Sequence, residues 1–262
     1  VPYKLTFTAG KGTGDITWEI SDDIPAGLSF DTVSAELSGI PGAAFNGYVR
    51  VGATNSGGSA VKRFKLTVKS QKPVISITGM GDAVKGQPYT ASASVTGTNP
   101  ITVPVDKLPA GVTYAYVSKD TAVNFSGTPT DWGKFSVKIT AQNTGGKTTK
   151  TKSLKVNSAP AITTTALKEA TTGKSYSARL KADGTKKITW SVAEGSSLPS
   201  GISLKGSSGA LSGKTTGDGT YTVRFAATND YGSDSKDLTL KVNAVAPKIR
   251  TSSLKKGTAG SP

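Results

Sequence analysis

The feature that most constrains this chain is a set of short strings that recur in one fixed order at long intervals. An apolar residue, Pro, a small residue and Gly stand in that order at residues 24–27, 108–111 and 198–201. Ser-Gly-x-Pro follows at 38–41 and 126–129, with Ser-Gly-x-Thr at 212–215, and Ala-x-Asn follows at 53–55, 141–143 and 227–229. A period of about 87 residues predicts tandem domains, because a single large fold does not repeat its landmarks in this way.

The same landmarks predict where each repeat begins and ends. We expect a first repeat at 1–70, a second at 73–157 and a third at 160–243. Residues 1–3 align with Gln87-Pro88-Tyr89, so the first repeat is expected to lack its first strand. Residues 247–262 align with the opening segment of a repeat and are expected to be an orphan first strand of a fourth repeat. The connections are short and end in Pro, which favours an elongated rod.

The hydrophobic pattern predicts an all-β fold. Short segments alternate apolar and polar residues and are separated by turn residues about every 8–12 positions, which is typical of a β-sandwich. No segment of useful length has the helical period. The last two strands of each repeat alternate most clearly, and their predicted inward residues are Val49, Val137, Val223, Val51, Ile139, Phe225, Ala53, Ala141, Ala227, Leu66, Leu154, Leu240, Val68, Val156 and Val242.

Three local features add detail to this prediction. Trp18 and Trp190 fall on the third strand of their repeats, where Val103 stands in the second repeat. The Asn that closes each Ala-x-Asn string is followed by Gly within three residues, which predicts a hairpin turn between the last two strands. Phe45-Asn46-Gly47 breaks the aromatic spacing of the other repeats, and a bulge or shift is expected near Tyr48.

Composition excludes several classes of site and favours one kind of partner. The chain has no Cys and no His, so Ser-His and Cys-His nucleophile arrangements cannot be built. It carries 32 Lys and Arg against 17 Asp and Glu, a formal charge of +15. Such a surface either keeps a secreted protein soluble or contacts polyanions, for which nucleic acid, acidic glycans and cell-wall polymers are the candidates. No specific nucleic-acid motif and no membrane-inserting segment are visible. Basic residues recur at equivalent outward positions, and the candidate polyanion contacts are Arg50, Lys138, Arg224, Lys65, Lys155 and Lys241.

The strings of residues 188–242 also carry a resemblance. Ile-Thr-Trp, Leu-Pro-Ser-Gly-Ile-Ser-Leu, Gly-Ala-Leu-Ser-Gly, Gly-Thr-Tyr-Thr-Val and Ala-Thr-Asn follow one another there. In this the chain resembles the tandem immunoglobulin-like repeats of bacterial surface and secreted proteins, relatives of the dystroglycan-type cadherin-like domains. The resemblance covers nearly the whole chain, and it implies tandem Ig-like sandwiches and an extracellular or cell-surface location. It is specific for fold and not for activity.

Neither the resemblance nor the residues strongly support a bound cofactor or a catalytic site. The cadherin relation raises calcium, but the connections carry no carboxylates, and Asp22-Asp23 and Asn229-Asp230 are the isolated candidates. Glu19 with Asp22 or Asp23 is the one carboxylate pairing that could flank a sugar, and no counterpart recurs in the other repeats. We therefore expect no cofactor, no catalytic residue and no enzyme activity.

The predicted function is a structural or adhesive stalk segment of a large bacterial surface or secreted protein, projecting or spacing other domains. Self-association is an accompanying expectation, in which residues 247–255 add as a strand to the first repeat of another copy. One alternative is a polyanion- or glycan-binding module that acts through the repeated basic positions. A second alternative is an accessory region of an extracellular polysaccharide-degrading enzyme.

Overall fold

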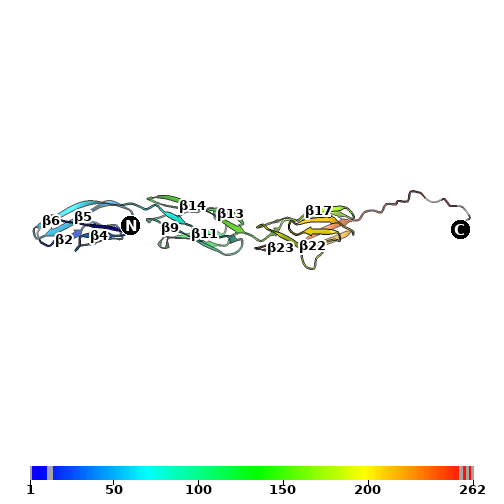
Figure 1. Cartoon of the computed structure of the whole chain (residues 1–262), viewed down its shortest axis with the longest axis horizontal. Helices are drawn as coiled ribbons and strands as arrows, with labels where there is room; N and C mark the ends of the chain where they lie inside the picture. Colours follow the sequence, from blue (N-terminus) through cyan, green and yellow to red (C-terminus); the bar gives the residue numbers. More distant parts are fainter. Residues whose placement is uncertain (1, 11–13, 254–255, 258–259, 261–262) are drawn as a thin grey trace. The chain divides into compact units, whose positions relative to one another are not determined.

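The computed structural model describes residues 2–10, 14–253, 256–257 and 260, and these form strands joined by turns and loops (Figure 1). The predicted all-β class is confirmed. The helical element in this described part is a 3-10 turn, η1 (Ser118–Asp120), which is far too short to span a lipid bilayer. The chain consists of two compact units, Val1–Val156 and Asn157–Pro262. The first unit contains the residues of the first two repeats, and the predicted repeat boundaries stay a prediction.

Residues of the first repeat form two antiparallel sheets of three strands each. One sheet has the order β1-β4-β3 and the other the order β2-β5-β6. The strands are β1 (Tyr3–Thr6), β2 (Thr17–Ile20), β3 (Leu28–Asp31), β4 (Glu36–Gly39), β5 (Phe45–Asn55) and β6 (Gly58–Val68).

Residues of the second repeat form two sheets of four strands, with the orders β11-β12-β9-β7 and β10-β13-β14-β8. The opening segment contributes one short strand to each sheet. The strands are β7 (Val74–Ser76), β8 (Ala83–Val84), β9 (Tyr89–Thr96), β10 (Val105–Asp106), β11 (Val112–Val117), β12 (Ala122–Gly127), β13 (Gly133–Asn143) and β14 (Gly146–Asn157).

Residues of the third repeat form a sheet β17-β21-β20, a sheet β16-β23-β22-β19 and a two-stranded pair β15-β18. Strand β16 runs parallel to β23, and the other pairings are antiparallel. The strands are β15 (Ala161–Ile162), β16 (Ala170–Thr171), β17 (Ser175–Arg179), β18 (Ala182–Asp183), β19 (Thr189–Val192), β20 (Ile202–Lys205), β21 (Ala210–Lys214), β22 (Gly219–Asn229) and β23 (Gly232–Asn243).

The core lies on the side that the alternation predicts. Val137, Ile139, Val223 and Phe225 are fully buried, and the last strands add Leu154, Leu240, Val156 and Val242 from the same side. Ala53 and Val68 are the exceptions among the predicted inward residues, since both are only half-buried. Trp190 lies on β19 and is 6% exposed, while Trp18 on β2 is partly buried against the core of its repeat.

The two glycine-containing strings of each repeat contact one another, which the sequence alone does not show. Gly201 has a φ of 83° and Gly213 a φ of 142°. A Cβ on Gly201 would collide with the carbonyl oxygen of Lys214, and a Cβ on Gly213 with that of Gly201. The Lys214 N–H donates to the Gly201 carbonyl at 3.0 Å. The same pairing joins 27 with 39 and 111 with 127, so both strings belong to one close crossing of backbones.

The predicted hairpins are confirmed, and the predicted bulge near Tyr48 is wrong. Strands β5 and β6 pair in unbroken register from Phe45 opposite Val68 to Asn55 opposite Gly58. The aromatic residue simply stands two positions earlier than Phe135 of the second repeat. Its ring folds back over Gly47, where a Cβ would lie only 2.6 Å from the ring carbon Cζ of Phe45. The ring thus covers the site of the missing side chain without any change of register.

The described residues that follow β23 form no strand within this chain. Residues 244–253 are exposed, and the side chain of Ile249 is 88% exposed. The expected orphan strand is therefore unpaired here over these residues. Positions 254–255, 258–259 and 261–262 of that expected strand lie outside the described residues. Strand addition to another copy stays a prediction.

Candidate functional site

The six repeated basic residues lie on the long hairpin strands and on strand faces turned away from the core. Arg50, Lys138 and Arg224 are exposed at equivalent positions of β5, β13 and β22. Lys65 and Lys241 are also exposed, on β6 and β23, while Lys155 on β14 is half-buried. The alternation that buries their neighbours places all six on the outer side, as predicted.

In the first repeat the repeated basic residue is held by a carboxylate. The Arg50 Nη2 atom lies 2.7 Å from Asp22 Oδ1, and Nε lies 3.0 Å from the same oxygen. The Arg50 backbone N–H also donates to Asp22 Oδ2 at 2.6 Å. Hydrogen bonding from the Arg50 side chain holds the pKa of Asp22 below its usual value and raises the pKa of Arg50. This guanidinium already has a partner in the folded chain.

Three further positions have acidic neighbours. Lys138 Nζ lies 3.9 Å from Asp106 Oδ2, and Arg224 Nε lies 4.0 Å from Asp237 Oδ1. Lys241 Nζ lies 3.1 Å from Glu169 Oε1, and Asn243 donates to the other oxygen of Glu169 at 2.7 Å. The Asn243 and Lys241 hydrogen bonds lower the pKa of Glu169.

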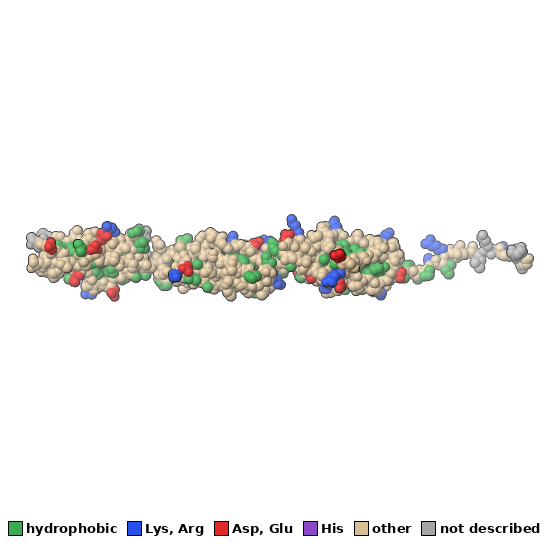
Figure 2. All heavy atoms as spheres, turned by 90° about the horizontal axis from the view of Figure 1, so that it is seen from below, with side chains coloured by type: hydrophobic (Ala, Val, Ile, Leu, Met, Phe, Trp, Pro, Cys, Tyr) green, Lys and Arg blue, Asp and Glu red, His purple; other side chains and the backbone are tan. Residues whose placement is uncertain are grey.

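The six basic positions thus differ in whether a carboxylate lies close to them. Four lie within 4.0 Å of a carboxylate, while Lys65 and Lys155 make no ion pair within the part of the chain that is described. On the face drawn in Figure 2, basic and acidic side chains accordingly lie next to one another in several places. A polyanion at the four paired positions would compete with those carboxylates, and contact through the six residues stays a prediction.

Sequence reasoning missed what the Ala-x-Asn strings do beyond the turn. Asn143 Nδ2 donates to the carbonyl oxygens of Gln71 and Thr98, both at 2.7 Å, and its Oδ1 accepts the N–H of Gly145 at 2.8 Å. Gln71 belongs to the connection that precedes the second repeat. One amide side chain therefore joins the connection, a loop and the hairpin turn.

The third repeat repeats this arrangement. Asn229 Nδ2 donates to Ser158 O at 2.9 Å and to Thr185 O at 2.8 Å, and its Oδ1 accepts the N–H of Tyr231. Nearby, the backbone N–H of Ile162 donates to Asp234 Oδ2 at 2.7 Å. The connection that leads into each of these repeats is bound to that repeat's own last hairpin.

The carboxylates of the described residues do not gather into a group that could hold a metal ion. No group of three or more His, Cys, Asp or Glu residues lies together among these residues. Asp22 is bound by Arg50, and the side-chain amide of Asn229 donates to the Ser158 carbonyl of the connection.

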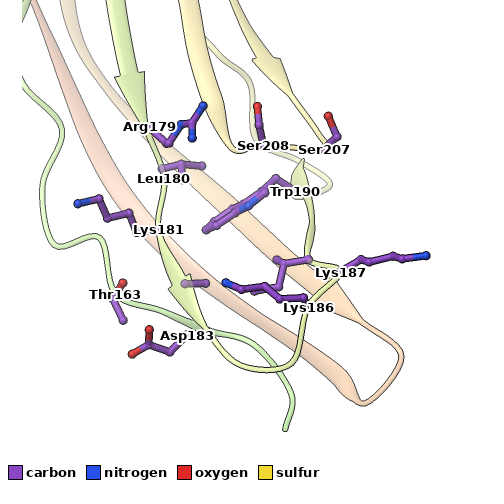
Figure 3. A pocket seen from close by; sticks show the side chains of 12 residues that line it. Thr163, Arg179, Leu180, Lys181, Asp183, Lys186, Lys187, Trp190, Ser207 and Ser208 are labelled. Atoms are coloured by element: carbon purple, nitrogen blue, oxygen red, sulfur yellow. The ribbon is translucent and has the colours of Figure 1, made fainter. Parts of the chain in front are cut away.

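Sequence reasoning also missed a basic groove in the third repeat. The groove has a volume of about 590 Å³, and its rim holds Arg179, Lys181, Lys186 and Lys187 around the Trp190 ring (Figure 3). Arg179 ends β17, Lys181 directly precedes β18, and Lys186 and Lys187 lie in the loop between β18 and β19. The adjacent pair Lys186-Lys187 was the visible hint, but only the fold brings Arg179 beside it.

The comparisons with known proteins bear on this same repeat. Residues 159–243 match the family described as "Putative Ig domain". The third repeat is thus similar to immunoglobulin-like domains. No curated protein is similar enough in sequence to match the chain.

Solved structures to which this chain is similar include tandem Ig proteins. An I-band fragment of titin is 18% identical, with 94% of this chain and 93% of that chain covered and a TM-score of 0.48. The eight N-terminal Ig domains of Down syndrome cell adhesion molecule are 19% identical, with 94% and 35% covered and a TM-score of 0.43. An endo-fucoidan hydrolase of glycoside hydrolase family 107 is 19% identical, with 94% and 42% covered and a TM-score of 0.33. Such similarities concern the fold alone.

Proposed function

We propose that this chain is a non-catalytic structural or adhesive segment that spaces and projects other domains of a bacterial surface or secreted protein. The observation that carries the proposal is the pair of equivalent hydrogen-bond sets made by Asn143 and Asn229. Each set binds the incoming connection to the body of its repeat. A connection that is held in this way transmits position from one repeat to the next better than a free tether does.

Neighbouring contacts support the same role. Thr185, which is 9% exposed, accepts the Ser158 N–H through Oγ1 at 2.9 Å. In the second repeat, Thr148 Oγ1 donates to Pro73 O at 2.5 Å. A Cβ on Gly145 would lie 2.5 Å from Ser70 O, so the turn and the connection are in close contact. Several bonds must therefore break together before a connection becomes free.

Small-angle X-ray scattering of the full chain tests the spacing role. Three sandwiches of about 35 Å placed end to end give a radius of gyration of about 30 Å. A single compact globule of this length would give about 18 Å. We expect the larger value, and a value close to 18 Å would contradict the proposal.

A pair of variants tests the hydrogen bonds themselves. Asn143→Ala with Asn229→Ala removes both donors, and we expect a broader distribution of interatomic distances because the connections are released. Gln142→Ala with Thr228→Ala is the matched control, since both side chains are exposed next to the two Asn residues. Circular dichroism establishes that both variants remain folded. Identical scattering from the two variants would show that the Asn side chains do not fix the connections.

The two alternatives stay predictions. A polyanion-binding module that acts through the repeated basic positions would have to displace the carboxylates described above. An accessory role in a polysaccharide-degrading enzyme would require a catalytic domain elsewhere in the same protein.

A further inference from the structure

We propose that the basic groove of the third repeat, formed by Arg179, Lys181, Lys186, Lys187 and Trp190, binds an anionic polysaccharide. This site is distinct from the six repeated basic positions and goes beyond the spacing function. Its ligand class is a glycan that carries sulfate or carboxylate groups along the chain.

The charge of the groove is the first argument. Its lining contains four exposed basic side chains and one acidic side chain, Asp183. Among the described residues, none of the four basic side chains lies within 4.0 Å of a carboxylate oxygen, unlike Arg50 or Lys241. Figure 3 shows Arg179 and Lys186 on opposite sides of the Trp190 ring, with Lys181 and Lys187 extending outward. Unpaired cations on the rim of a hollow attract and orient a polyanion.

The second argument is that hydrogen bonds hold the backbone around the groove in place. Two buried residues, Leu180 and Trp190, lie in the groove lining, and their backbone N–H groups donate at 2.8 Å to Gly209 O and Gly206 O. Lys181 is held on both sides, because its N–H donates to Thr164 Oγ1 at 2.7 Å and its carbonyl accepts the Thr163 N–H at 2.9 Å. A preformed backbone lowers the entropy lost when a ligand binds.

The second repeat shows that the fold does not require these charges. Residues 86–102 align without a gap to 173–189, and the Thr98 and Thr185 carbonyls accept equivalent Asn hydrogen bonds. The counterparts of the four basic residues are Ser92, Ser94, Asn99 and Pro100, and the counterpart of Trp190 is Val103. The basic groove is therefore an addition to the common framework of the two repeats.

The shape of the groove favours a glycan over a nucleic acid. Trp190 is the aromatic residue among the described groove lining, and it is only 6% exposed, so no ring face is open for base stacking. Proteins that bind single-stranded nucleic acids rely on such stacking of bases on open aromatic rings. A sugar acid or sulfate requires only cations at the rim and hydroxyl contacts, which Ser207 and Thr163 offer there.

The experiment measures binding of the full chain to two probes, heparin for sulfate and polygalacturonate for carboxylate, across a series of NaCl concentrations. The groove variant carries Arg179→Ser, Lys181→Ser, Lys186→Asn and Lys187→Ser, three of which copy the second repeat. The control variant carries Lys119→Ser, Lys134→Ser, Lys147→Ser and Lys150→Ser, which removes the same charge from exposed positions elsewhere. We expect at least a tenfold loss of affinity in the groove variant and less than a twofold loss in the control.

Further readouts make the result decisive. With Trp18→Phe and Trp132→Phe, the remaining Trp190 reports binding at the groove by its fluorescence. Lys186→Gln with Lys187→Gln replaces the larger variant if that one fails to fold.

Equal loss of affinity in the groove variant and the control variant, or no binding of either probe by the unmodified chain, overturns the proposal. Tighter binding of single-stranded DNA through the same four residues overturns the ligand class. Scattering of the groove variant should match that of the unmodified chain, so the spacing function is tested separately.

Discussion

At the scale of single residues, the repeated strings serve backbone geometry. Gly201 and Gly213 bring two strands closer than any side chain allows, and Pro199 sets the turn in which the Ile202 N–H donates to the Pro199 carbonyl at 3.1 Å. The Asn of the third string supplies donors and an acceptor to three backbone segments. These residue types recur because each repeat must make the same turn and the same contacts.

The backbone crossing gives a prediction with an internal control. Gly201→Ala should destabilise the third repeat by about 2–4 kcal/mol, since the new Cβ meets the Lys214 carbonyl. Gly173→Ala should be destabilising by only about 1 kcal/mol, because Gly173 has a similar φ of 73° but no atom within 4 Å of the Cβ position. Urea unfolding of both variants measures the loss in free energy of unfolding. Equal losses would mean that the positive φ alone accounts for the destabilisation.

At the scale of elements, the long hairpin of each repeat is the most regular part of the fold. Strands β13 and β14 pair from Gly133 opposite Val156 to Asn143 opposite Gly146, with a two-residue turn between them. The first repeat keeps the same pairing although its aromatic residue is displaced. A ring folded over a neighbouring glycine can therefore replace a side chain that would stand at that glycine.

The packing of the displaced aromatic ring is tested by moving the aromatic residue to the position that it has in the second repeat. Phe45→Ala should destabilise the first repeat by about 3–4 kcal/mol, because Gly47 then leaves a hole beside Leu66. Phe45→Gly with Gly47→Phe copies Gly133 and Phe135 of the second repeat and should recover at least half of that loss. Thermal unfolding of both variants gives the comparison, and a double variant no more stable than Phe45→Ala would contradict this packing.

At the scale of the whole molecule, the absence of His and Cys fixes how the chain responds to its surroundings. No His side chain is present to titrate near neutral pH, and no disulfide responds to redox conditions. The groups whose pKa is altered are of types that titrate at acidic or at alkaline pH. Backbone N–H groups of Val33 and Ser34 lower the pKa of Asp31, and burial raises the pKa of Tyr89, Tyr116 and Tyr176.

Stability should therefore be constant through neutral pH and decline at both ends. The folded pKa of Asp22, Asp31 and Glu169 lies below the unfolded value, so their stabilisation is complete above about pH 4.5 and is lost as the pH falls through the folded pKa. For the three tyrosines, stability is retained below about pH 10 and lost as the pH rises further.

Melting temperatures measured from pH 2 to 11 test this profile, with Asp22→Asn as the matched variant. The difference between the variant and the unmodified chain should vanish at the acid end, where Asp22 is protonated in both states. A large change of melting temperature between pH 6 and 8 would contradict the assignment.

The sequence by itself determined the all-β class, the inward faces of the long strands and the hairpin turns. It could do so because strand alternation has a period of two residues and turn chemistry is local, so both are visible in short windows. The tertiary structure alone decided which residues from distant segments meet. It paired Arg50 with Asp22, bound Asn229 to the connection at Ser158, and gathered Arg179 with Lys186 around Trp190. Those contacts depend on how strand ends and loops pack across sheets, which no local period encodes.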